Sequence, residues 1–333
     1  MRYSELKTAL EQAKSVLLMP HVGPDADSLG SVLGMKFAIE KTWPTISTVH
    51  VVMDGALPVV YGFLPGSHEV ANIETATHLL HEPYDVAIAA DCGSVDRLGE
   101  PGKHFKQAKT SVNIDHHVSN DYFGTLNIVE TDAGASGLVI ARILEEWGVT
   151  LDANIAPNLY AAIVTDTGGF KYSSTSVEIF TLAAQLMAAG ANPETIYKEV
   201  YENRPLGQVM LQAETLMRTQ FSDCRQIAWT AVTRHDLNKH HCLDEHVDGL
   251  IEQIRNIDTV KLAAVFKENR DGSTKVSFRS DDHAFDVSKV AGHFGGGGHK
   301  MASGCTIADA IDDAKPQVLA LLETLLSTMP CRS

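Results

Sequence analysis

The chain has 333 residues, which is more than one hydrophobic core usually supports, so its length favours two domains. Its 42 acidic and 27 basic residues give a formal net charge of −15, which disfavours binding to long nucleic acids because that binding depends on many Lys and Arg contacts. No window approaches 18 uninterrupted apolar residues, and the five cysteines form no C-x-x-C pair. We therefore expect a cytoplasmic protein that does not associate with membranes.

The first 190 residues alternate short apolar runs rich in β-formers with segments of helical periodicity. Strands are predicted at 15–20, 47–54, 84–91 and 110–115, and helices at 28–41, 134–148 and 176–190. Strands that are apolar throughout indicate a parallel sheet with helices on both faces. The chain is therefore expected to begin with an α/β domain.

The pattern changes after residue 190. Gly190 and Pro193 end the preceding helix, and helical segments to about residue 219 are interpreted as a connector. Further strands are predicted at 226–233, 260–269 and 274–280, the last two joined by an RDGS turn, and a final helix at 308–328 that Pro316 kinks or breaks. The sequence thus predicts domains at 1–190 and 220–333, separated by the connector 191–219.

Acidic residues and histidines follow four of the apolar segments where each segment ends. They are His21, Asp25, Asp27, Asp91, Asp115, His116, His117 and Asp166. Ligands of open parallel sheets bind beyond the carboxyl ends of the strands, so these side chains are expected to converge there. Five aspartates and three histidines held that close would repel one another unless cations lay among them. A single Asp after a strand is more often a helix cap or an Asx turn, and for Asp115 that alternative stays open.

Two further segments contain residues that bind metals or anions in other proteins. KHHCLDEH at 239–246 follows no apolar strand and lies among charges, which favours a solvated loop or helix over a zinc site. Four glycines, Gly295, Gly296, Gly297 and Gly298, let backbone N–H groups approach an anion, although a flexible loop is an equal alternative for the glycines alone. His299 and Arg279 favour phosphate recognition here, because a guanidinium suits a bidentate grip on phosphate.

These motifs together resemble those of the DHH/DHHA1 phosphoesterase family. HVGPDADSLGS (21–31), ADCG (90–93), NIDHHVSN (113–120) and TDTGGF (165–170) occur in the order of the family's DHH motifs, and FGGGGHKMASG (294–304) resembles the glycine-rich motif of its DHHA1 domain. The resemblance implies a parallel-sheet DHH domain and a smaller α/β DHHA1 domain across a cleft.

The resemblance also implies a centre with two metal ions. One ion would be held by His21, Asp25 and Asp91, and the other by Asp27, Asp91, His116 and Asp166. Carboxylates mixed with imidazole suit a six-coordinate ion, so two Mn²⁺ are expected, with Mg²⁺ or Co²⁺ as substitutes. Such a pair would polarise the phosphoryl group and activate a water for attack on phosphorus.

The remaining motif residues receive supporting roles by the same resemblance. His117 would donate to the phosphate or to the leaving oxygen, and Asp115 would position the histidine pair. Arg279, Gly295–Gly298 and His299 would bind the rest of the substrate.

The two-domain size is similar to that of family members that degrade very short oligoribonucleotides to mononucleotides and convert 3′-phosphoadenosine 5′-phosphate to AMP. The enzymatic alternative is a cyclic-di-AMP phosphodiesterase, and the non-enzymatic one is a nucleotide-sensing module. Family II pyrophosphatases are disfavoured, because the basic S-R-K-K-Q-type motif of their second domain is absent. The sequence shows no run that combines aromatic and basic residues, so we expect short RNA or a small nucleotide as substrate and no long strand. It leaves open whether the chain forms a homodimer.

Overall fold

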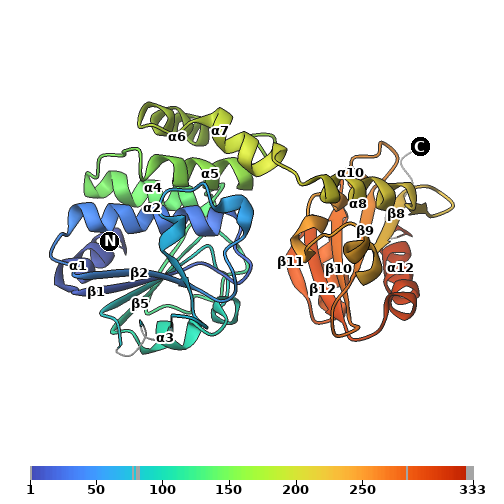
Figure 1. Cartoon of the computed structure of the whole chain (residues 1–333), viewed down its shortest axis with the longest axis horizontal. Helices are drawn as coiled ribbons and strands as arrows, with labels where there is room; N and C mark the ends of the chain where they lie inside the picture. The colour runs from blue at the N-terminus through green and yellow to red at the C-terminus, as the bar shows by residue number, and fades with distance from the viewer. Residues whose placement is uncertain (1, 77–78, 80–82, 283, 328–333) are drawn as a thin grey trace. The chain divides into compact units, whose positions relative to one another are not determined.

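A computed structural model of the protein describes residues 2–76, 79, 83–282 and 284–327. It contains two compact units, Met1–Asn203 and Arg204–Ser333 (Figure 1). The boundary falls inside the segment 191–219 that the sequence predicted to be a connector. Helix α7 (Pro193–Tyr197) of that segment belongs to the first unit, and α8 (Leu206–Met217) belongs to the second.

The first unit is built on a six-stranded sheet in which every neighbouring pair of strands is parallel, in the order β3-β2-β1-β4-β5-β6. Its strands are β1 (Ser15–Met19), β2 (Thr48–Met53), β3 (Val70–Asn72), β4 (Val86–Ala90), β5 (Thr110–Asp115) and β6 (Leu126–Val129). Four of them coincide with predicted strands, and the parallel α/β class is confirmed. The chain order changes direction between β1 and β4, which is where open α/β sheets bind ligands.

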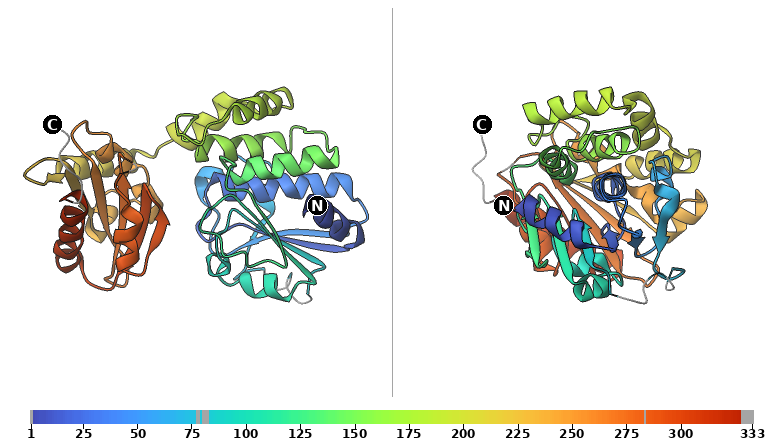
Figure 2. Two further views of the ribbon diagram at one scale, coloured as in Figure 1. Left: turned by 180° about the vertical axis from the view of Figure 1, so that it is seen from behind. Right: turned by 90° about the vertical axis from the view of Figure 1, so that its left-hand side faces the viewer.

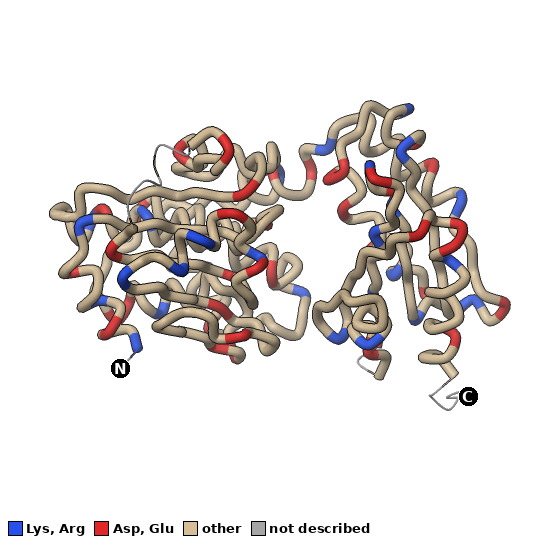
Figure 3. Tube along the Cα trace, turned by 90° about the horizontal axis from the view of Figure 1, so that it is seen from below, with Lys and Arg blue, Asp and Glu red and all other residues tan. Residues whose placement is uncertain are grey.

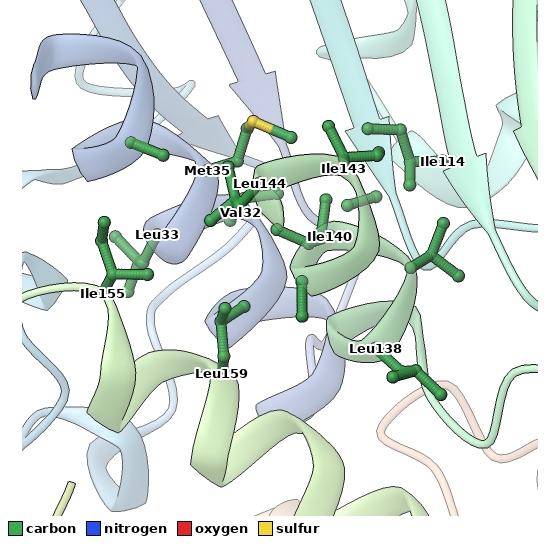
Figure 4. Close-up of a cluster of buried hydrophobic side chains, with 14 of the residues drawn as sticks. Val32, Leu33, Met35, Ile114, Leu138, Ile140, Ile143, Leu144, Ile155 and Leu159 are labelled. Atoms are coloured by element: carbon green, nitrogen blue, oxygen red, sulfur yellow. The ribbon is translucent and has the colours of Figure 1, made fainter. Parts of the chain in front are cut away.

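Helices bury one face of this sheet under a large apolar core (Figures 1 and 4). The helices are α1 (Arg2–Gln12), α2 (Ala26–Thr42), α4 (Ser136–Trp147), α5 (Ala156–Asp166) and α6 (Val177–Ala188). Figure 4 shows Val32 of α2, Ile140 of α4 and Leu159 of α5 meeting in this core. Helix α5 can approach α2 closely because residue 30 is glycine: a Cβ there would lie 2.3 Å from the Asn158 carbonyl oxygen.

A smaller core covers the other face of the sheet. Leu17, Met19 and Ala87 pack there against Phe105 of α3 (Gly102–Gln107), and Figure 2 shows the sheet with its covering helices from behind. Successive residues of β1 therefore enter different cores: Val16 and Leu18 one, Leu17 and Met19 the other. This two-sided burial explains why the predicted strands are apolar throughout.

The second unit contains a mixed sheet in the order β11-β12-β10-β9-β8-β7, antiparallel except for the pair β8 and β9. Its strands are β7 (Gln220–Phe221), β8 (Ile227–Val232), β9 (Leu262–Glu268), β10 (Thr274–Ser280), β11 (Gly297–His299) and β12 (Ala302–Ile307). Helices α11 (Val287–His293) and α12 (Ile311–Ser327) pack on one face, and α8, α9 (Arg234–Lys239) and α10 (Leu250–Arg255) on the other. The predicted hairpin of β9 and β10 is present, with Gly272 of its turn at φ 86°.

The final helix continues through Pro316, where the sequence predicts a kink or a break. This residue lies inside α12, which continues through it from Ile311 to Ser327, so a break at Pro316 is wrong. Proline costs the helix one backbone hydrogen bond, but Ala314, Val318 and Leu322 on both sides of it are fully buried in the core of the second unit. The packing of this apolar face outweighs the lost hydrogen bond.

The structure also bears on cysteine pairing and membrane insertion. Cys92, Cys224, Cys242 and Cys305 are free thiols, whereas Cys331 and Thr328 lie outside the described residues. Within the described part of the chain, no helix is long and apolar enough to cross a bilayer.

Candidate metal centre

The six predicted metal ligands, together with Asp115 and His117, lie at the carboxyl edge of the first sheet. His21 and Asp25 lie on the loop from β1 to α2, Asp91 directly follows β4, and the Asp115–His117 run ends β5. Two more come from helices, since Asp27 lies in the first turn of α2 and Asp166 ends α5. The strands are parallel, so their carboxyl ends meet and bring these loops together.

His21, Asp25 and Asp91 form one group of potential ligands, with atoms within 4.8 Å of one another. The Nδ1 atom of His21 lies 3.0 Å from the Val22 carbonyl oxygen. Its Nε2 atom faces Asp25 Oδ1 at 3.9 Å and Asp91 Oδ2 at 3.7 Å. A ring that donates Nδ1–H to a carbonyl presents an unprotonated Nε2, which is the usual state of a histidine that ligates a metal.

Asp27, His116 and Asp166 form a second group that meets the same distance criterion. His116 repeats the geometry of His21, with Nδ1 3.2 Å from the Ala133 carbonyl oxygen. Its Nε2 is buried 3.8 Å from Asp27 Oδ2 and 3.2 Å from Asp166 Oδ2, and it makes no hydrogen bond within the described part of the chain. A neutral ring would leave this buried atom unsatisfied at a cost of about 1–3 kcal/mol, so the position favours either a proton or a bound cation.

Asp91 belongs to the first group and also forms a third group of potential ligands with Asp115, His116 and His117, so it faces histidines of the first and second groups. Its Oδ2 faces His21, while its Oδ1 lies 3.5 Å from His116 Nε2 and accepts a hydrogen bond from Ser136 Oγ at 3.0 Å. Its φ of 58° is left-handed, a conformation that Asp adopts more readily than most residues. One carboxylate oxygen directed at each group is the arrangement that a bridging ligand requires.

Asp27 is fully buried, and its carboxylate lies at the start of helix α4. Its Oδ2 accepts from the Ser136 N–H at 2.7 Å and its Oδ1 from the Gly137 N–H at 2.8 Å, and these are the first amides of α4. Burial, followed by the charges of Asp91 and Asp166, raises the pKa of Asp27 well above its usual range. The carboxylates of the cluster therefore cannot all be ionised at low energetic cost unless a cation compensates them.

Asp115 orients the two histidines that follow it. Its Oδ1 accepts from the His116 N–H and from His117 Nδ1, both at 2.8 Å, and its Oδ2 accepts from Asn120 Nδ2. Burial alone would raise the pKa of Asp115, but the hydrogen bonds from His117 and Asn120 hold it below its usual value. Burial disfavours a charged His117 ring, but the hydrogen bond to Asp115 and the charge of Asp91 raise the pKa of His117.

Three residues that support the centre were not identified from the sequence. Ser28 Oγ accepts from the His21 N–H and donates to the Ala90 carbonyl oxygen, both at 3.1 Å, so it ties the ends of β1 and β4 together. Ser28 and Asn120 lie inside the quoted motifs, which is a signal that could have found them. Ser136 has no such signal, because its contact with Asp91 depends on tertiary structure.

The residues predicted to bind substrate lie in the second unit. Arg279 on β10 donates from Nε to Glu252 Oε1 at 2.9 Å, so its guanidinium already has a carboxylate partner. Gly297–His299 form the exposed strand β11, which pairs with β12.

Two of the four glycines are required by that pairing. A Cβ at residue 296 would lie 2.2 Å from the Gly304 carbonyl oxygen, and one at Gly298, where φ is 134°, would lie 2.7 Å from the Ala302 carbonyl oxygen. Gly295 has a φ of 74°, whereas Gly297 has neither a positive φ nor any atom within 4 Å of a Cβ position.

Two of the three histidines in the segment 239–246 have other partners. His240 Nε2 lies 2.7 Å from Glu214 Oε2, and His246 Nδ1 accepts from the Leu243 N–H at 3.1 Å. In the described ranges, every group of side chains that could hold a metal ion lies in the first unit. This agrees with the interpretation of the segment as a surface structure and not a zinc site.

Two family models match the chain, the DHH family, N-terminal domain, over residues 15–163, and the DHHA1 domain over residues 236–328. The first match contains all of the potential ligands except Asp166. The chain therefore consists of a DHH-family N-terminal domain followed by a DHHA1 domain.

Curated relatives match nearly the whole chain. A bifunctional oligoribonuclease and PAP phosphatase, NrnA, of Bacillus subtilis is 27% identical over 325 residues, which cover 97% of this chain and 98% of that protein. The Thermus thermophilus protein of the same name is 28% identical over 307 residues, covering 91% of this chain and 88% of that protein. A solved structure of an exopolyphosphatase-related protein from Bacteroides fragilis has a TM-score of 0.88 and 23% identity, and the match covers 98% of this chain and 96% of that one. That structure supports the fold.

Proposed function

We propose that this protein is a two-metal phosphoesterase that hydrolyses short oligoribonucleotides to mononucleotides and 3′-phosphoadenosine 5′-phosphate to AMP. The observation that carries the proposal is the position of Asp91, which directs one oxygen at His21 and the other at His116. Two neighbouring ligand groups joined by one carboxylate are typical of enzymes that hydrolyse phosphate esters. The names of the NrnA relatives support the choice of substrates.

The donor set fits hard divalent ions, and we propose Mn²⁺ with Mg²⁺ or Co²⁺ as substitutes. The proposed ligands are His21, Asp25, Asp27, Asp91, His116 and Asp166. Bound ions would neutralise the charge that develops on the phosphoryl oxygens and lower the pKa of the attacking water. Free thiols and the cysteine pattern support a cytoplasmic location.

His117 is proposed to supply a proton in the reaction, and Asp115 is proposed to position His117. Hydrolysis joins a water oxygen to phosphorus and breaks the bond from phosphorus to the leaving oxygen, which must gain a proton. His117 is proposed to donate it, because the Asp115 carboxylate fixes the ring and raises its pKa. Asp115 acts as a positioning residue, since the N–H groups and the Asn120 amide around it already use both of its oxygens.

The second unit is proposed to bind the part of the substrate that lies away from the metal centre. Exposed backbone at Gly297 and the His299 side chain would contact a phosphate, and Arg279 would reach it from its ion pair with Glu252. Gly295, Gly296 and Gly298 would support this site through the backbone conformation of β11.

A hydrolysis panel tests the proposal. The purified chain with Mn²⁺ is given a dinucleotide, 3′-phosphoadenosine 5′-phosphate, cyclic-di-AMP and pyrophosphate in parallel, and we expect the first two to be hydrolysed fastest. Preference for cyclic-di-AMP would replace the proposed substrate, and binding of nucleotides without turnover of any substrate would indicate a sensing module.

Substrate length gives a second test. Acidic and basic residues are interspersed along the trace in both units (Figure 3), and the net charge of −15 disfavours a long strand. RNAs of two to five nucleotides should therefore be hydrolysed fastest, and the rate should fall as the RNA becomes longer. The longest RNA in the series has about 24 nucleotides, more than the roughly 16 nucleotides that one single-strand-binding fold covers. Equal rates on the dinucleotide and the longest RNA would contradict the proposed substrate class.

A further inference from the structure

The loop after Asp166 has an uncommon backbone. Gly168, Gly169 and Phe170 are consecutive and all have positive φ values, of 60°, 71° and 67°. A left-handed conformation costs a non-glycine residue such as Phe170 about 1–3 kcal/mol, and residues of this kind cluster at functional sites. The turn is held by the Gly169 N–H, which donates to the Val164 carbonyl oxygen at 2.7 Å.

This turn brings Tyr172 back towards Asp166. The Tyr172 N–H donates to the Thr167 carbonyl oxygen at 3.0 Å, and a Cβ on Gly168 would lie 2.5 Å from the Tyr172 ring. The ring therefore rests on the backbone two residues after a proposed metal ligand. The side chain is still 42% exposed, which leaves ring surface open to a ligand.

Two more tyrosines reach the same loop from later in the chain. The ring centroids of Tyr197, on α7, and Tyr201 lie 4.7 Å apart, and a Cβ on Gly169 would lie 3.8 Å from the Tyr197 ring. Tyr201 donates to the Val164 carbonyl oxygen at 3.4 Å. Burial, and then the nearby Tyr197, Tyr172 and Asp166, raise the pKa of Tyr201 to about 12. We call Tyr172, Tyr197 and Tyr201 the tyrosine cluster.

Basic residues flank the tyrosine cluster. Lys171 Nζ lies 5.4 Å from the centroid of the Tyr172 ring, and Lys198 follows Tyr197. Both lysines are exposed, and within the described ranges neither forms an ion pair. Tertiary structure thus places aromatic and basic residues together beside the metal centre, although the sequence has no single run that combines them.

We propose that Tyr172 and Tyr197 form a stacking site for the nucleobase of the nucleotide whose phosphate lies at the metal centre, with Lys171 beside that nucleotide's backbone. The inference rests on the proposed function and adds a site for the base. Aromatic rings accept any of the four bases, because every base has a π-face, so such a site suits an enzyme that degrades short RNA of any sequence. The base is inferred to belong to the nucleotide at the metal centre because Asp166, a proposed metal ligand, begins the loop on which Tyr172 lies.

The test compares Tyr172→Ala with the wild-type chain on an adenine dinucleotide. Loss of one stacked base should raise KM roughly 5- to 100-fold. We expect kcat and the bound Mn²⁺ content to stay unchanged, since neither tyrosine is a proposed ligand. Tyr172→Trp should retain the wild-type KM, because it keeps an aromatic face, and Tyr197→Ala should raise KM in the same direction.

Two controls separate stacking from a structural effect. Phe221→Ala removes an exposed aromatic ring from β7 of the second unit and should leave KM unchanged. The second control uses two abasic dinucleotides, each lacking one base. On one of these abasic dinucleotides, the KM of the wild-type chain should equal the KM of Tyr172→Ala on the complete dinucleotide. On that same abasic dinucleotide, Tyr172→Ala should have the same KM as the wild-type chain.

The outcomes distinguish this site from the proposed function. An unchanged KM for Tyr172→Ala on a dinucleotide that the wild-type chain hydrolyses would overturn the stacking site and leave the function standing. The same holds if removing either base leaves the wild-type KM unaltered. If the wild-type chain hydrolyses no dinucleotide at all, the proposed function itself is wrong.

Discussion

The sequence contains two sets of candidate functional residues, one in the metal centre and one in the glycine segment 295–298. The two sets differ in how far the packing of the fold alone explains the residues present. In the metal centre, the Asp27 side chain and the Nε2 atom of His116 are buried at an energetic cost that sheet and helix packing alone do not explain. In the glycine segment, the approach of β11 to β12 by itself requires glycine at 296 and 298. Buried polar residues are therefore stronger evidence of function than a run of glycines is, and Gly297 is the position that neither packing nor backbone conformation requires to be glycine.

The largest effect is expected at Asp91, because one substitution there weakens both ligand groups. Asp91→Ala should reduce kcat by more than about 100-fold, beyond the usual effect of residues that only support a ligand, and by more than Asp25→Ala. Turnover measured at saturating Mn²⁺ checks this, with Asp96→Ala, an exposed carboxylate five residues later, as the matched control. Activity within about tenfold of the wild-type value would remove Asp91 from the centre of the mechanism.

The adjacent histidines should separate metal binding from proton transfer. His116→Ala removes the nitrogen directed at Asp27 and Asp166, so the purified variant should contain less Mn²⁺. His117→Ala should retain its Mn²⁺ and lower kcat, by roughly 100-fold or more if the ring is the general acid. Metal analysis of the two proteins decides, and equal metal loss in both would contradict the division of roles.

The affinity of the cluster for Mn²⁺ should depend on pH, because some of its ligands hold protons when no metal is bound. Burial raises the pKa of Asp27; burial disfavours a charged His116 ring, but Asp166 and Asp91 raise the pKa of His116 to about 12. Both groups thus retain protons that Mn²⁺ must displace, so affinity should rise with pH, by roughly tenfold per pH unit for each proton released. Calorimetric titrations between about pH 6 and about pH 8 in two buffers of different ionisation enthalpy would count these protons. An affinity independent of pH would show that the metal-free cluster binds no excess protons.

The smallest effects are expected in the glycine segment, where two neighbouring glycines should respond differently. Gly298→Ala must accommodate a φ of 134° and a contact with the Ala302 carbonyl oxygen, so it should lower the free energy of unfolding by about 1–3 kcal/mol. Gly297→Ala should change that free energy by less than about 0.5 kcal/mol and instead raise KM, because its Cβ would occupy the proposed anion site. Thermal unfolding and kinetics of both variants provide the measurements. Equal destabilisation, or an unchanged KM for Gly297→Ala, would leave the segment with a purely structural role.

Much of the first unit could be predicted from the sequence because its signals are local. Strands such as β1 and β4 are buried on both faces and therefore appear as continuous apolar runs, and parallel pairing brings the residues that follow them together. The short strands β3 and β6 gave no such run and were missed. Strand β12 was missed because its residues were interpreted only as part of the glycine-rich motif.

Other features depend on contacts between distant segments. Ser136 supports Asp91 only because the helix it begins packs against β5, and nothing in the local sequence indicates this. The tyrosine cluster combines the loop after α5 with α7 and the residues that follow it, so neither segment reveals it alone. The partner of Arg279 is likewise a residue of another element, Glu252 of α10.

The hydrogen bonds of Asp27 also affect how the first unit folds. Helix α4 begins at Ser136 after an alanine that cannot cap it, and its first amides bond instead to a carboxylate 109 positions earlier in the chain. An isolated α4 segment has no such acceptor, so the first turn of the helix is completed only after α2 has docked. Closing so long a loop is slow compared with local helix formation, which places this turn late in the order of folding. The chain consequently completes its second ligand group only when the packing of α2 against α4 is finished, and a partly folded chain does not present that group to metal ions.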